Sequence, residues 1–358
     1  MTAGKTDSEL IEVRPDERLD SGPLEAWLRD NLEGAEGSFD YSQFGGGHAN
    51  LTYLLRFGHN EFVLRRPPLG PIAASAHDMS REHRVLSVLW LEFDLAPRCY
   101  LLCTDPDIIG ADFMVMERRN GFVIRKDLPD NLQGDPVLAR RIGEMIIDCL
   151  ARFHKTEPAA VGLEAMGRPE GFAQRQLEGW TGRWQAAKDQ DIPAMDRLTA
   201  WLAHNLPKPQ AATFVHNDYK LDNMLVAHDD PARAVAVLDW DMCTRGDPLM
   251  DLGYLLTYWP EAGDPLTWRD SCPSPLWRDG FPTRAEAVQR YAELSGLDVS
   301  QSAWYHAWGT FKIAVVIQQI YIRWLRGQTQ DERFAEMGER VRILIDKGCK
   351  IAGVSGGS

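Results

Sequence analysis

The pattern of apolar and polar positions divides the chain into a part with short strands and a longer part with helices. From residue 39 to residue 118, apolar runs of strand length are separated by turns rich in glycine, proline and asparagine, which predicts a β-sheet. The predicted strands are Phe39–Phe44, Leu51–Phe57, Glu61–Arg65, Arg98–Leu102 and Asp112–Met116, and the one predicted helix among them is His77–Trp90.

Beyond residue 135 the apolar positions recur with helical spacing, as on the buried face of a helix. A shorter segment of the same kind, Leu19–Leu32, precedes the strands. The predicted helices are Pro136–Lys155, Phe172–Lys188, Ala194–Asn205, Leu249–Trp259, one opened by a capping box at Thr283–Glu286, Ser302–Arg326 and Glu332–Ala352. The proline-rich stretch 261–281 is predicted to be an irregular loop.

One hairpin interrupts the helical part. The apolar runs Met224–Val226 and Ala234–Leu238 flank a turn rich in aspartate and proline, which is a hairpin signal. Because a hairpin brings its two ends together, we expect Asn223, before the first strand, to lie beside Asp239, after the second. Asp218 precedes Asn223 by one turn of loop.

The polar residues at the ends of this hairpin are of the type that binds Mg²⁺. Carboxylate and amide oxygens suit a hard cation that shares its coordination shell with substrate phosphates, so the arrangement indicates phosphoryl transfer. The predicted metal ligands are Asn223, Asp239 and Asp241. The alternative is a polar loop between buried strands, because turns collect aspartate and asparagine for capping and turn geometry.

The loop before the hairpin has the spacing of a kinase catalytic loop, His216-x-Asp218-x-x-x-x-Asn223. In that pattern the aspartate accepts the proton of the acceptor hydroxyl. This role falls on Asp218, and Lys220 corresponds to the lysine that approaches the transferred phosphate. For His216 a structural role is predicted.

Three segments, His216–Asn223, Leu238–Asp241 and Gly246–Gly253, resemble the aminoglycoside phosphotransferase family of kinase-like enzymes. Within that family the chain is most similar to the branch of kinase-like domains found fused to acyl-CoA dehydrogenases. The resemblance extends from about Phe39 to the C-terminal helices. It also implies that Asp251 braces the catalytic loop.

The resemblance implies an α+β, protein-kinase-like bilobed fold, with an antiparallel N-terminal sheet lobe and a mainly helical C-terminal lobe. It implies ATP and Mg²⁺ as cofactors and a hydroxylated small molecule as phosphate acceptor. The acceptors known for the family include aminoglycosides and other hydroxylated antibiotics, sugars and amino alcohols, and the branch favours hydroxyacyl thioesters or related metabolites. We expect a division into 1–38 (N-terminal extension), 39–118 (nucleotide-binding sheet lobe), 119–134 (linker), 135–352 (helical lobe) and 353–358 (disordered tail).

A glycine-rich turn joins the first two strands of the sheet. Gly45, Gly46 and Gly47 would let backbone N–H groups approach nucleotide phosphates, because glycine has no side chain in the way and tolerates positive φ. The spacing differs from the protein-kinase glycine loop, and a flexible turn is the alternative. Adenine recognition is predicted at the sheet edge, through the backbone of Met116, Glu117 and Arg118.

A cation on the third strand is predicted to pair with the nucleotide phosphates. Most kinases carry lysine there, whereas Arg65 stands here, which is a departure from the wider family. Glu82 lies on an otherwise apolar helix face and needs a cationic partner. Arg65 is the predicted partner, and the alternative is that Glu82 turns to solvent and pairs with Arg81 or Arg84.

Composition narrows the functional classes. The chain has 358 residues, 44% of them hydrophobic and 25% charged, as in a soluble globular protein. The formal net charge of −13 argues against a general nucleic-acid binder, which needs a basic surface. The six cysteines lack zinc-site spacing.

The N-terminus lacks the apolar core of a signal peptide, and no apolar run is long enough to cross a bilayer. We therefore expect a cytoplasmic protein without membrane or nucleic-acid partners.

A second functional class fits the same sequence. Because Arg65 replaces the usual lysine and the glycine turn is irregular, the chain could instead be a nucleotide-binding pseudokinase that does not transfer phosphate.

Overall fold

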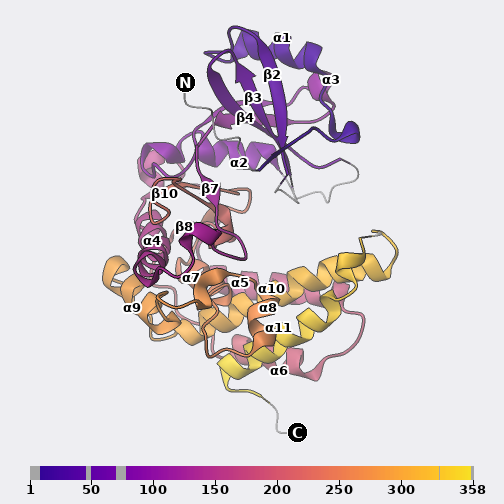
Figure 1. Cartoon of the computed structure of the whole chain (residues 1–358). Helices are drawn as coiled ribbons and strands as arrows, with labels where there is room; N and C mark the ends of the chain where they lie inside the picture. Colours follow the sequence, from indigo (N-terminus) through magenta and orange to yellow (C-terminus); the bar gives the residue numbers. More distant parts are fainter. Residues whose placement is uncertain (1–8, 46–49, 70–77, 330, 356–358) are drawn as a thin grey trace. The chain divides into compact units, whose positions relative to one another are not determined.

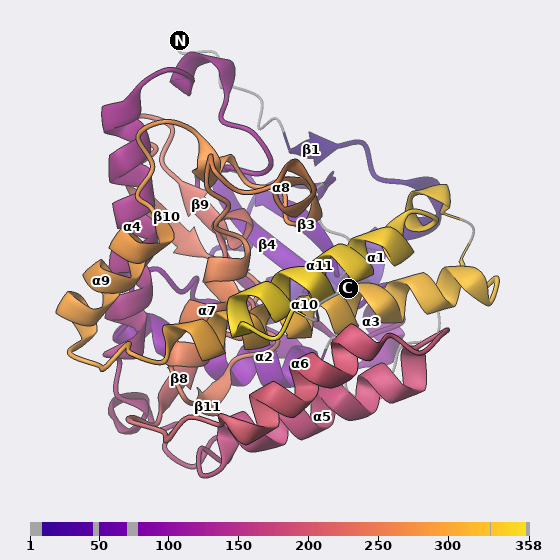
Figure 2. The same cartoon turned by 90° about the horizontal axis from the view of Figure 1, so that it is seen from below.

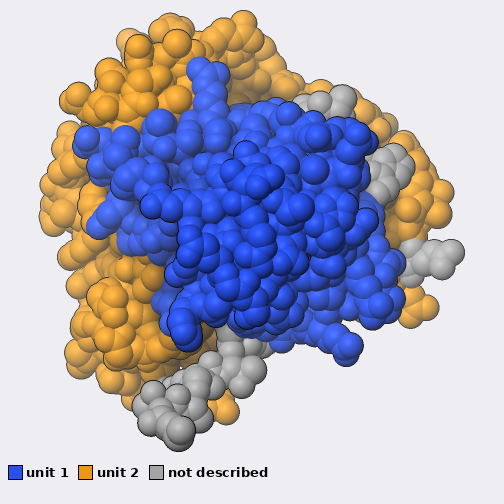
Figure 3. All heavy atoms as spheres, turned by 90° about the horizontal axis from the view of Figure 1, so that it is seen from above, with its two compact units in different colours: residues 1–120, 236–241 blue, residues 121–235, 242–358 orange. Residues whose placement is uncertain are grey.

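The computed structural model describes residues 9–45, 50–69, 78–329 and 331–355. The chain forms two compact units, one of residues 1–120 and 236–241 and one of residues 121–235 and 242–358 (Figure 3). The predicted metal ligands Asp239 and Asp241 therefore belong to the first unit, although the rest of the catalytic stretch belongs to the second.

The first unit is built on a six-stranded sheet with the strand order β1-β2-β3-β4-β6-β5 (Figure 1), and all its strand pairs are antiparallel. The strands are β1 (Leu10–Ile11), β2 (Phe39–Phe44), β3 (Leu51–Phe57), β4 (Asn60–Arg66), β5 (Cys99–Cys103) and β6 (Phe113–Glu117). Tyr53, Leu55 and Phe57 alternate along β3 and are buried, as expected for a strand with one face in the core. The predicted sheet is confirmed, and β1 is an addition to it.

Helix α1 (Ser21–Asn31) packs its Leu24 and Leu28 into the same core as the alternating residues of β3. Asp20 caps its first turn by accepting a hydrogen bond from Gly22 N. Helix α2 (Met79–Leu86) is shorter than the predicted His77–Trp90, and a 3₁₀ helix (Leu89–Leu91) follows it. Where the sequence predicts only a turn, Asp105 caps a one-turn helix, α3 (Pro106–Ile109).

Two further sheets are small. Strands β7 (Phe122–Val123), β9 (Met224–Val226) and β10 (Ala234–Val237) form one, and β8 (Thr213–Val215) with β11 (Thr244–Gly246) forms the other. These strands belong to the second unit, except that residues 236 and 237 of β10 are assigned to the first. The predicted hairpin is confirmed, because β9 and β10 are neighbours and Ala227 N donates to Arg233 O at 3.0 Å. The sequence analysis missed β7, β8 and β11, which are too short to show an alternating pattern.

Helices make up most of the second unit (Figure 2). They are α4 (Pro136–His154), α5 (Phe172–Ala187), α6 (Pro193–His204), α7 (Leu249–Thr257), α8 (Leu266–Ser271), α9 (Arg284–Ser295), α10 (Ser302–Leu325) and α11 (Met337–Ala352). The predicted capping box is confirmed: Thr283 accepts from the backbone of Glu286, whose side chain accepts from Thr283 N. The prediction of an irregular loop over 261–281 was wrong, because α8 and a 3₁₀ helix (Pro275–Trp277) form within it.

None of the helices in the described part of the chain combines the length and the apolar character needed to span a bilayer.

Helices α7 and α10 touch through their backbones. A Cβ on Gly253 would lie 2.1 Å from Tyr305 O, and a Cβ on Gly309 would lie 2.5 Å from Gly253 O. No side chain fits at such distances, so glycine is required at both positions. This close approach fixes α10 against the helix that carries Asp251.

We expect Gly253→Ala to destabilise the protein by about 1–3 kcal/mol or more, because the added methyl group must push the two backbones apart. Gly179→Ala in α5 is the matched control. No atom lies within 4 Å of its added Cβ, so the better helix propensity of alanine should stabilise the protein by about 0.5–1 kcal/mol. Urea unfolding of both variants checks this, and a destabilisation of equal size in both would contradict it.

Candidate functional site

The catalytic loop of the second unit is held by a buried carboxylate. Asp251, on α7, accepts hydrogen bonds from His216 N at 2.6 Å and from Asn217 N at 2.7 Å. His154 lies 3.2 Å from the same carboxylate. Burial opposes ionisation, but the hydrogen bond and charge of His154 and the charge of His216 outweigh it, and the pKa of Asp251 is lowered. This is the bracing contact expected of Asp251.

The bracing contact forces the loop into an unusual conformation. Asn217 has a φ of 67°, in the left-handed region that few residues other than glycine adopt. Its side chain donates to Met242 O at 2.9 Å. The next residue, Asp218, donates from its backbone N to Nδ1 of His216 at 3.2 Å, in keeping with the structural role predicted for His216.

Three side chains converge on the carboxylate of Asp218. Lys220 Nζ lies 2.9 Å from Oδ1 and 2.8 Å from Oδ2. Asn223 Nδ2 donates to Oδ2 at 2.7 Å, and the hydroxyl of Tyr254 donates to Oδ1. The structure thus brings together the three predicted residues of the second unit, Asp218, Lys220 and Asn223.

Lys220 is cationic in this setting. Burial disfavours its ammonium group, but the charge of Asp218 and the neighbouring Tyr258 outweigh burial and raise the pKa of Lys220. Its ammonium also lies 5.4 Å from the centre of the Tyr258 ring. The approach of Lys220 to a transferred phosphate stays a prediction.

Tyr254 and Lys312 are contacts of this loop that the sequence analysis missed. Tyr254 follows Asp251 by one turn of α7, in a segment that reads as buried core. Lys312 interrupts a run of apolar residues in α10, and a lone lysine in such a run is the one signal that could have identified it.

In the first unit, Arg65 links two carboxylates. Its Nη1 lies 3.0 Å from Glu82 Oε1, and its Nη2 donates to Asp239 Oδ1. The predicted ion pair with Glu82 is confirmed, and the alternative pairing with Arg81 or Arg84 was wrong. Trp240 N also donates to Glu82 at 3.3 Å.

Burial and charge act with different balance on the pKa values of the two partners in this ion pair. Burial raises the pKa of Glu82 to about 7, because the desolvation of the carboxylate exceeds the attraction of Arg65. For Arg65 the balance is reversed. Burial favours the neutral form, but Glu82 and Asp239 together raise its pKa above the usual range. Arg65 therefore stays charged. Asp239 has a φ of 69°, so it shares the left-handed conformation of Asn217.

The predicted metal ligands are oxygen donors divided between the units. Asn223 uses Nδ2 to hold Asp218, which leaves Oδ1 as its ligand atom, and the hard oxygen set fits Mg²⁺. Asp239 and Asp241 lie in the other unit, so the convergence of the three stays a prediction. Among the described residues, no group of three or more histidine, cysteine, aspartate or glutamate side chains could hold a metal ion by itself.

The predicted nucleotide-binding residues are only partly described. Gly45 directly follows β2, and its N donates to Glu9 O at 2.9 Å, whereas Gly46 and Gly47 lie outside the described residues. Met116 does not lie at a sheet edge as predicted, because it pairs with Val63 of β4 on one side and with Cys99 of β5 on the other.

The two residues after Met116 have local partners. Glu117 N donates to Arg98 O at 2.8 Å, and the guanidinium of Arg118 lies 5.2 Å from the centre of the Phe44 ring. The N–H of Glu117 is therefore already used, and adenine recognition by the backbone of residues 116–118 stays a prediction.

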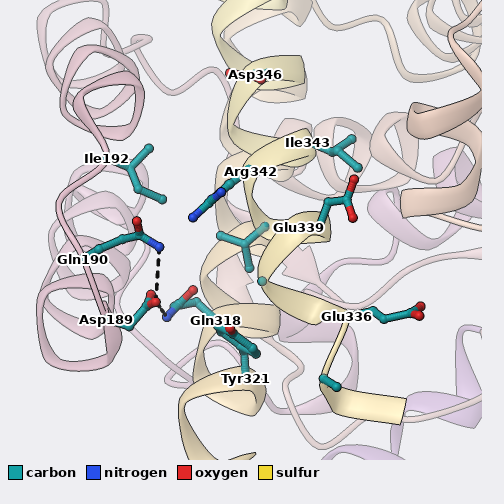
Figure 4. Close-up of a pocket in the computed structure, with 13 residues that line it drawn as sticks. Asp189, Gln190, Ile192, Gln318, Tyr321, Glu336, Glu339, Arg342, Ile343 and Asp346 are labelled. Carbon is teal, nitrogen blue, oxygen red and sulfur yellow. Dashed lines mark hydrogen bonds between the residues drawn. The ribbon is translucent and has the colours of Figure 1, made fainter. Parts of the chain in front are cut away.

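A cavity of about 640 Å³ lies in the second unit, between the segment that follows α5 and helices α10 and α11 (Figure 4). Its charged lining is mostly acidic: Asp189, Glu336, Glu339 and Asp346 against one cation, Arg342. No predicted site residue lines it.

The fold and the catalytic loop together define a kinase-like phosphotransferase class. A model of the phosphotransferase enzyme family matches residues 40–297, and the chain belongs to this family. The family resemblance and the kinase-like fold predicted from the sequence are thereby confirmed.

Particular relatives refine this assignment. Acyl-CoA dehydrogenase family member 11 of Homo sapiens is 33% identical over 362 residues, 98% of this chain and 46% of that protein. The chain thus spans about half the length of this relative. A solved structure from Ralstonia eutropha, named as a candidate aminoglycoside phosphotransferase, is 30% identical with a TM-score of 0.79, covering 95% of this chain and all of that one. A thermostable mutant of aminoglycoside phosphotransferase APH(4)-Ia, in complex with ADP and hygromycin B, shares the fold at 15% identity and a TM-score of 0.58, covering 94% and 99% of the two chains.

We expect the stability of the protein to fall as the pH rises from about 4.5 to about 7. The folded pKa of Glu82 is about 7 against an ordinary value of 4.5, so between these values the native state binds more protons than the unfolded state. Glu82→Gln should reduce this slope, measured by urea unfolding across the pH range. Glu61→Gln, which removes a surface partner of Arg56, is the control that should retain the slope. An unchanged slope in Glu82→Gln would refute the assignment.

Proposed function

We propose that this chain catalyses the Mg²⁺-dependent transfer of the γ-phosphate of ATP to a hydroxyl group of a small molecule. Membership of the phosphotransferase family supports the reaction class. The observation that carries the proposal is the carboxylate of Asp218, which is oriented by Lys220, Asn223 and Tyr254 on a loop braced by Asp251.

Asp218 is the proposed general base. It accepts the proton of the acceptor hydroxyl as the oxygen of that hydroxyl bonds to phosphorus and the bond to the leaving ADP breaks. Lys220 and Tyr254 hold the carboxylate in one orientation. The hydrogen bond from Asn223 Nδ2 fixes the position of the base relative to the proposed metal. The reason is that Oδ1 of the same amide is the proposed metal ligand.

Mg²⁺, when bound through Asn223, Asp239 and Asp241, would neutralise charge on the phosphates. Arg65 is the proposed phosphate-pairing cation of the first unit. Glu82 supports this role by holding one side of the guanidinium at 3.0 Å. Gly45, Gly46 and Gly47 are the proposed phosphate-binding turn, and the backbone of 116–118 the proposed adenine contact.

For the phosphate acceptor we propose a chemical class of small molecule. The match to acyl-CoA dehydrogenase family member 11 over 98% of this chain favours a hydroxyacyl thioester or a related hydroxylated metabolite. The structural relatives named as aminoglycoside phosphotransferases support an aminoglycoside-like antibiotic as the second candidate.

The competing proposal is a pseudokinase that binds nucleotide without transferring phosphate, favoured by arginine at position 65. The complete set of hydrogen bonds around Asp218 supports the enzyme, because a loop without catalytic work has no need to orient this carboxylate. Consumption of ATP distinguishes the two.

We expect Asp218→Asn to lower the rate of phosphate transfer about 10²- to 10⁴-fold, because the amide cannot accept the proton. A metabolite extract incubated with ATP and Mg²⁺ is searched by mass spectrometry for phosphorylated products. The initial rates of wild type and variant are then compared.

Asp222→Asn on the same loop is the matched control. Asp222 pairs with Arg125 at the surface, at 2.9 Å, and its variant should retain the wild-type rate. Phosphorylated product formed equally by Asp218→Asn would disprove the assignment of the base, and a wild-type protein that forms no product and consumes no ATP would favour the pseudokinase.

A further inference from the structure

Lys312 is a buried cation in the middle of α10 that the proposed mechanism does not use. Its residue exposure is 2%, and its neighbours along the helix are apolar. Burying an ammonium group is costly unless it is paired. Among the described residues, no carboxylate lies within ion-pair distance of it, so the position needs a specific explanation.

The ammonium group of Lys312 donates its hydrogen bond to the backbone oxygen of Asn217, at 2.5 Å. It also lies 4.5 Å from the centre of the Tyr254 ring, 5.5 Å from that of Trp180 and 5.6 Å from that of Trp308. Aromatic faces attract cations and offset part of their desolvation. Lys312 is thus enclosed by rings and directed at the catalytic loop.

From these contacts we infer that Lys312 is a positioning residue of the phosphotransfer reaction, which holds both the peptide leading into Asp218 and the ring of Tyr254. This inference rests on the proposed function.

The first route from Lys312 to Asp218 runs through the backbone. The carbonyl of Asn217 and the N–H of Asp218 belong to one planar peptide unit, so fixing the oxygen fixes the plane from which Asp218 extends. The other side of that plane is held by His216 Nδ1, which accepts from Asp218 N at 3.2 Å. The left-handed Asn217 would otherwise relax toward a commoner conformation.

The second route runs through Tyr254. Its hydroxyl donates to Oδ1 of Asp218, and the ammonium of Lys312 is near its ring. A cation against the ring withdraws electron density from the phenol, which strengthens the hydroxyl as a donor. Lys312 therefore acts on the base both through the loop and through a side chain of α7.

The charge of Lys312 is sensitive to pH. Burial lowers its pKa to about 8, and the charges of Asp218 and Asp251 offset this in part. The other charged groups that face it are Lys220 and Arg183, which both favour the neutral form.

We expect Lys312→Met to lower kcat by about 10²-fold and to leave the KM for ATP unchanged, because misplacing a catalytic group by about 1 Å has an effect of that size. The probe is ADP formation from ATP with Mg²⁺ and water as the acceptor. In the wild type kcat should fall as the pH rises through about 8, and in Lys312→Met this fall should be absent.

Lys347→Met is the matched control. Lys347 is also buried, with 1% exposure, and its ammonium donates to Thr257 O at 3.1 Å and lies 5.6 Å from the centre of the Trp268 ring. It touches no residue of the catalytic loop. Both variants should lower Tm, and only Lys312→Met should lower kcat. Equal losses of kcat in the two variants would overturn the inference.

Hydrogen exchange separates this inference from the proposed function. In Lys312→Met the backbone amides of residues 216–218 should exchange faster than in the wild type, whereas in Lys347→Met they should not. A wild-type protein that forms no ADP defeats the proposed function. In that case selective exchange in Lys312→Met still supports the holding of the loop, and equal exchange in the two variants overturns it.

Discussion

The buried carboxylate of Asp251 is the contact on which the candidate site depends. A buried charge is stable only when hydrogen bonds replace its hydration, and here the backbone amides of two consecutive residues, His216 and Asn217, do so. Both amides reach one carboxylate because Asn217 adopts a positive φ. Asp218 directly follows this turn. The carboxylate proposed as the base therefore follows a loop that is held by the buried charge of Asp251 on α7, a helix whose own position is set by the glycine contact with α10.

In the described residues, backbone strain occurs at two positions of the candidate site. The non-glycine residues with positive φ there are Asn217 and Asp239, one beside the proposed base and the other a proposed metal ligand. Asparagine and aspartate are the residues that tolerate this region best apart from glycine, because their short polar side chains bond locally. Each costs about 1–3 kcal/mol and persists only where surrounding contacts fix it. Asp251 provides such a contact for Asn217, and Arg65 provides one for Asp239.

Local sequence patterns predicted most helices and strands and the central residues of the candidate site. The residues that these patterns missed reach the site through tertiary contacts. β2 and β3 follow from apolar runs of strand length between turns, and the group of Asp218, Lys220 and Asn223 follows from motif spacing within a single loop. The pair of Arg65 and Glu82 could be predicted because a carboxylate on an apolar face needs a cation. Tyr254 and Lys312 reach the loop from α7 and α10, so motif spacing within the loop does not indicate them, and the lone lysine among the apolar residues of α10 is the one local signal. Most strands of two or three residues and the short α8 carry too few positions to show a period, and β9 could be predicted only because the turn rich in aspartate and proline follows it.

The arginine at position 65 departs from the lysine of most kinases, and the geometry of the first unit gives a reason. One guanidinium binds two carboxylates at once, with Nη1 on Glu82 and Nη2 on Asp239. These donors point in directions fixed by a planar fork, whereas an ammonium group presents one point charge. A lysine would have to bring both carboxylates to a single nitrogen, where they would repel each other at close range. Because burial already raises the pKa of Glu82 to about 7, that repulsion would favour its protonation and weaken the pair. The fork holds Glu82 and Asp239 apart while it donates to both, so arginine at this position is compatible with a retained ion pair rather than with its loss.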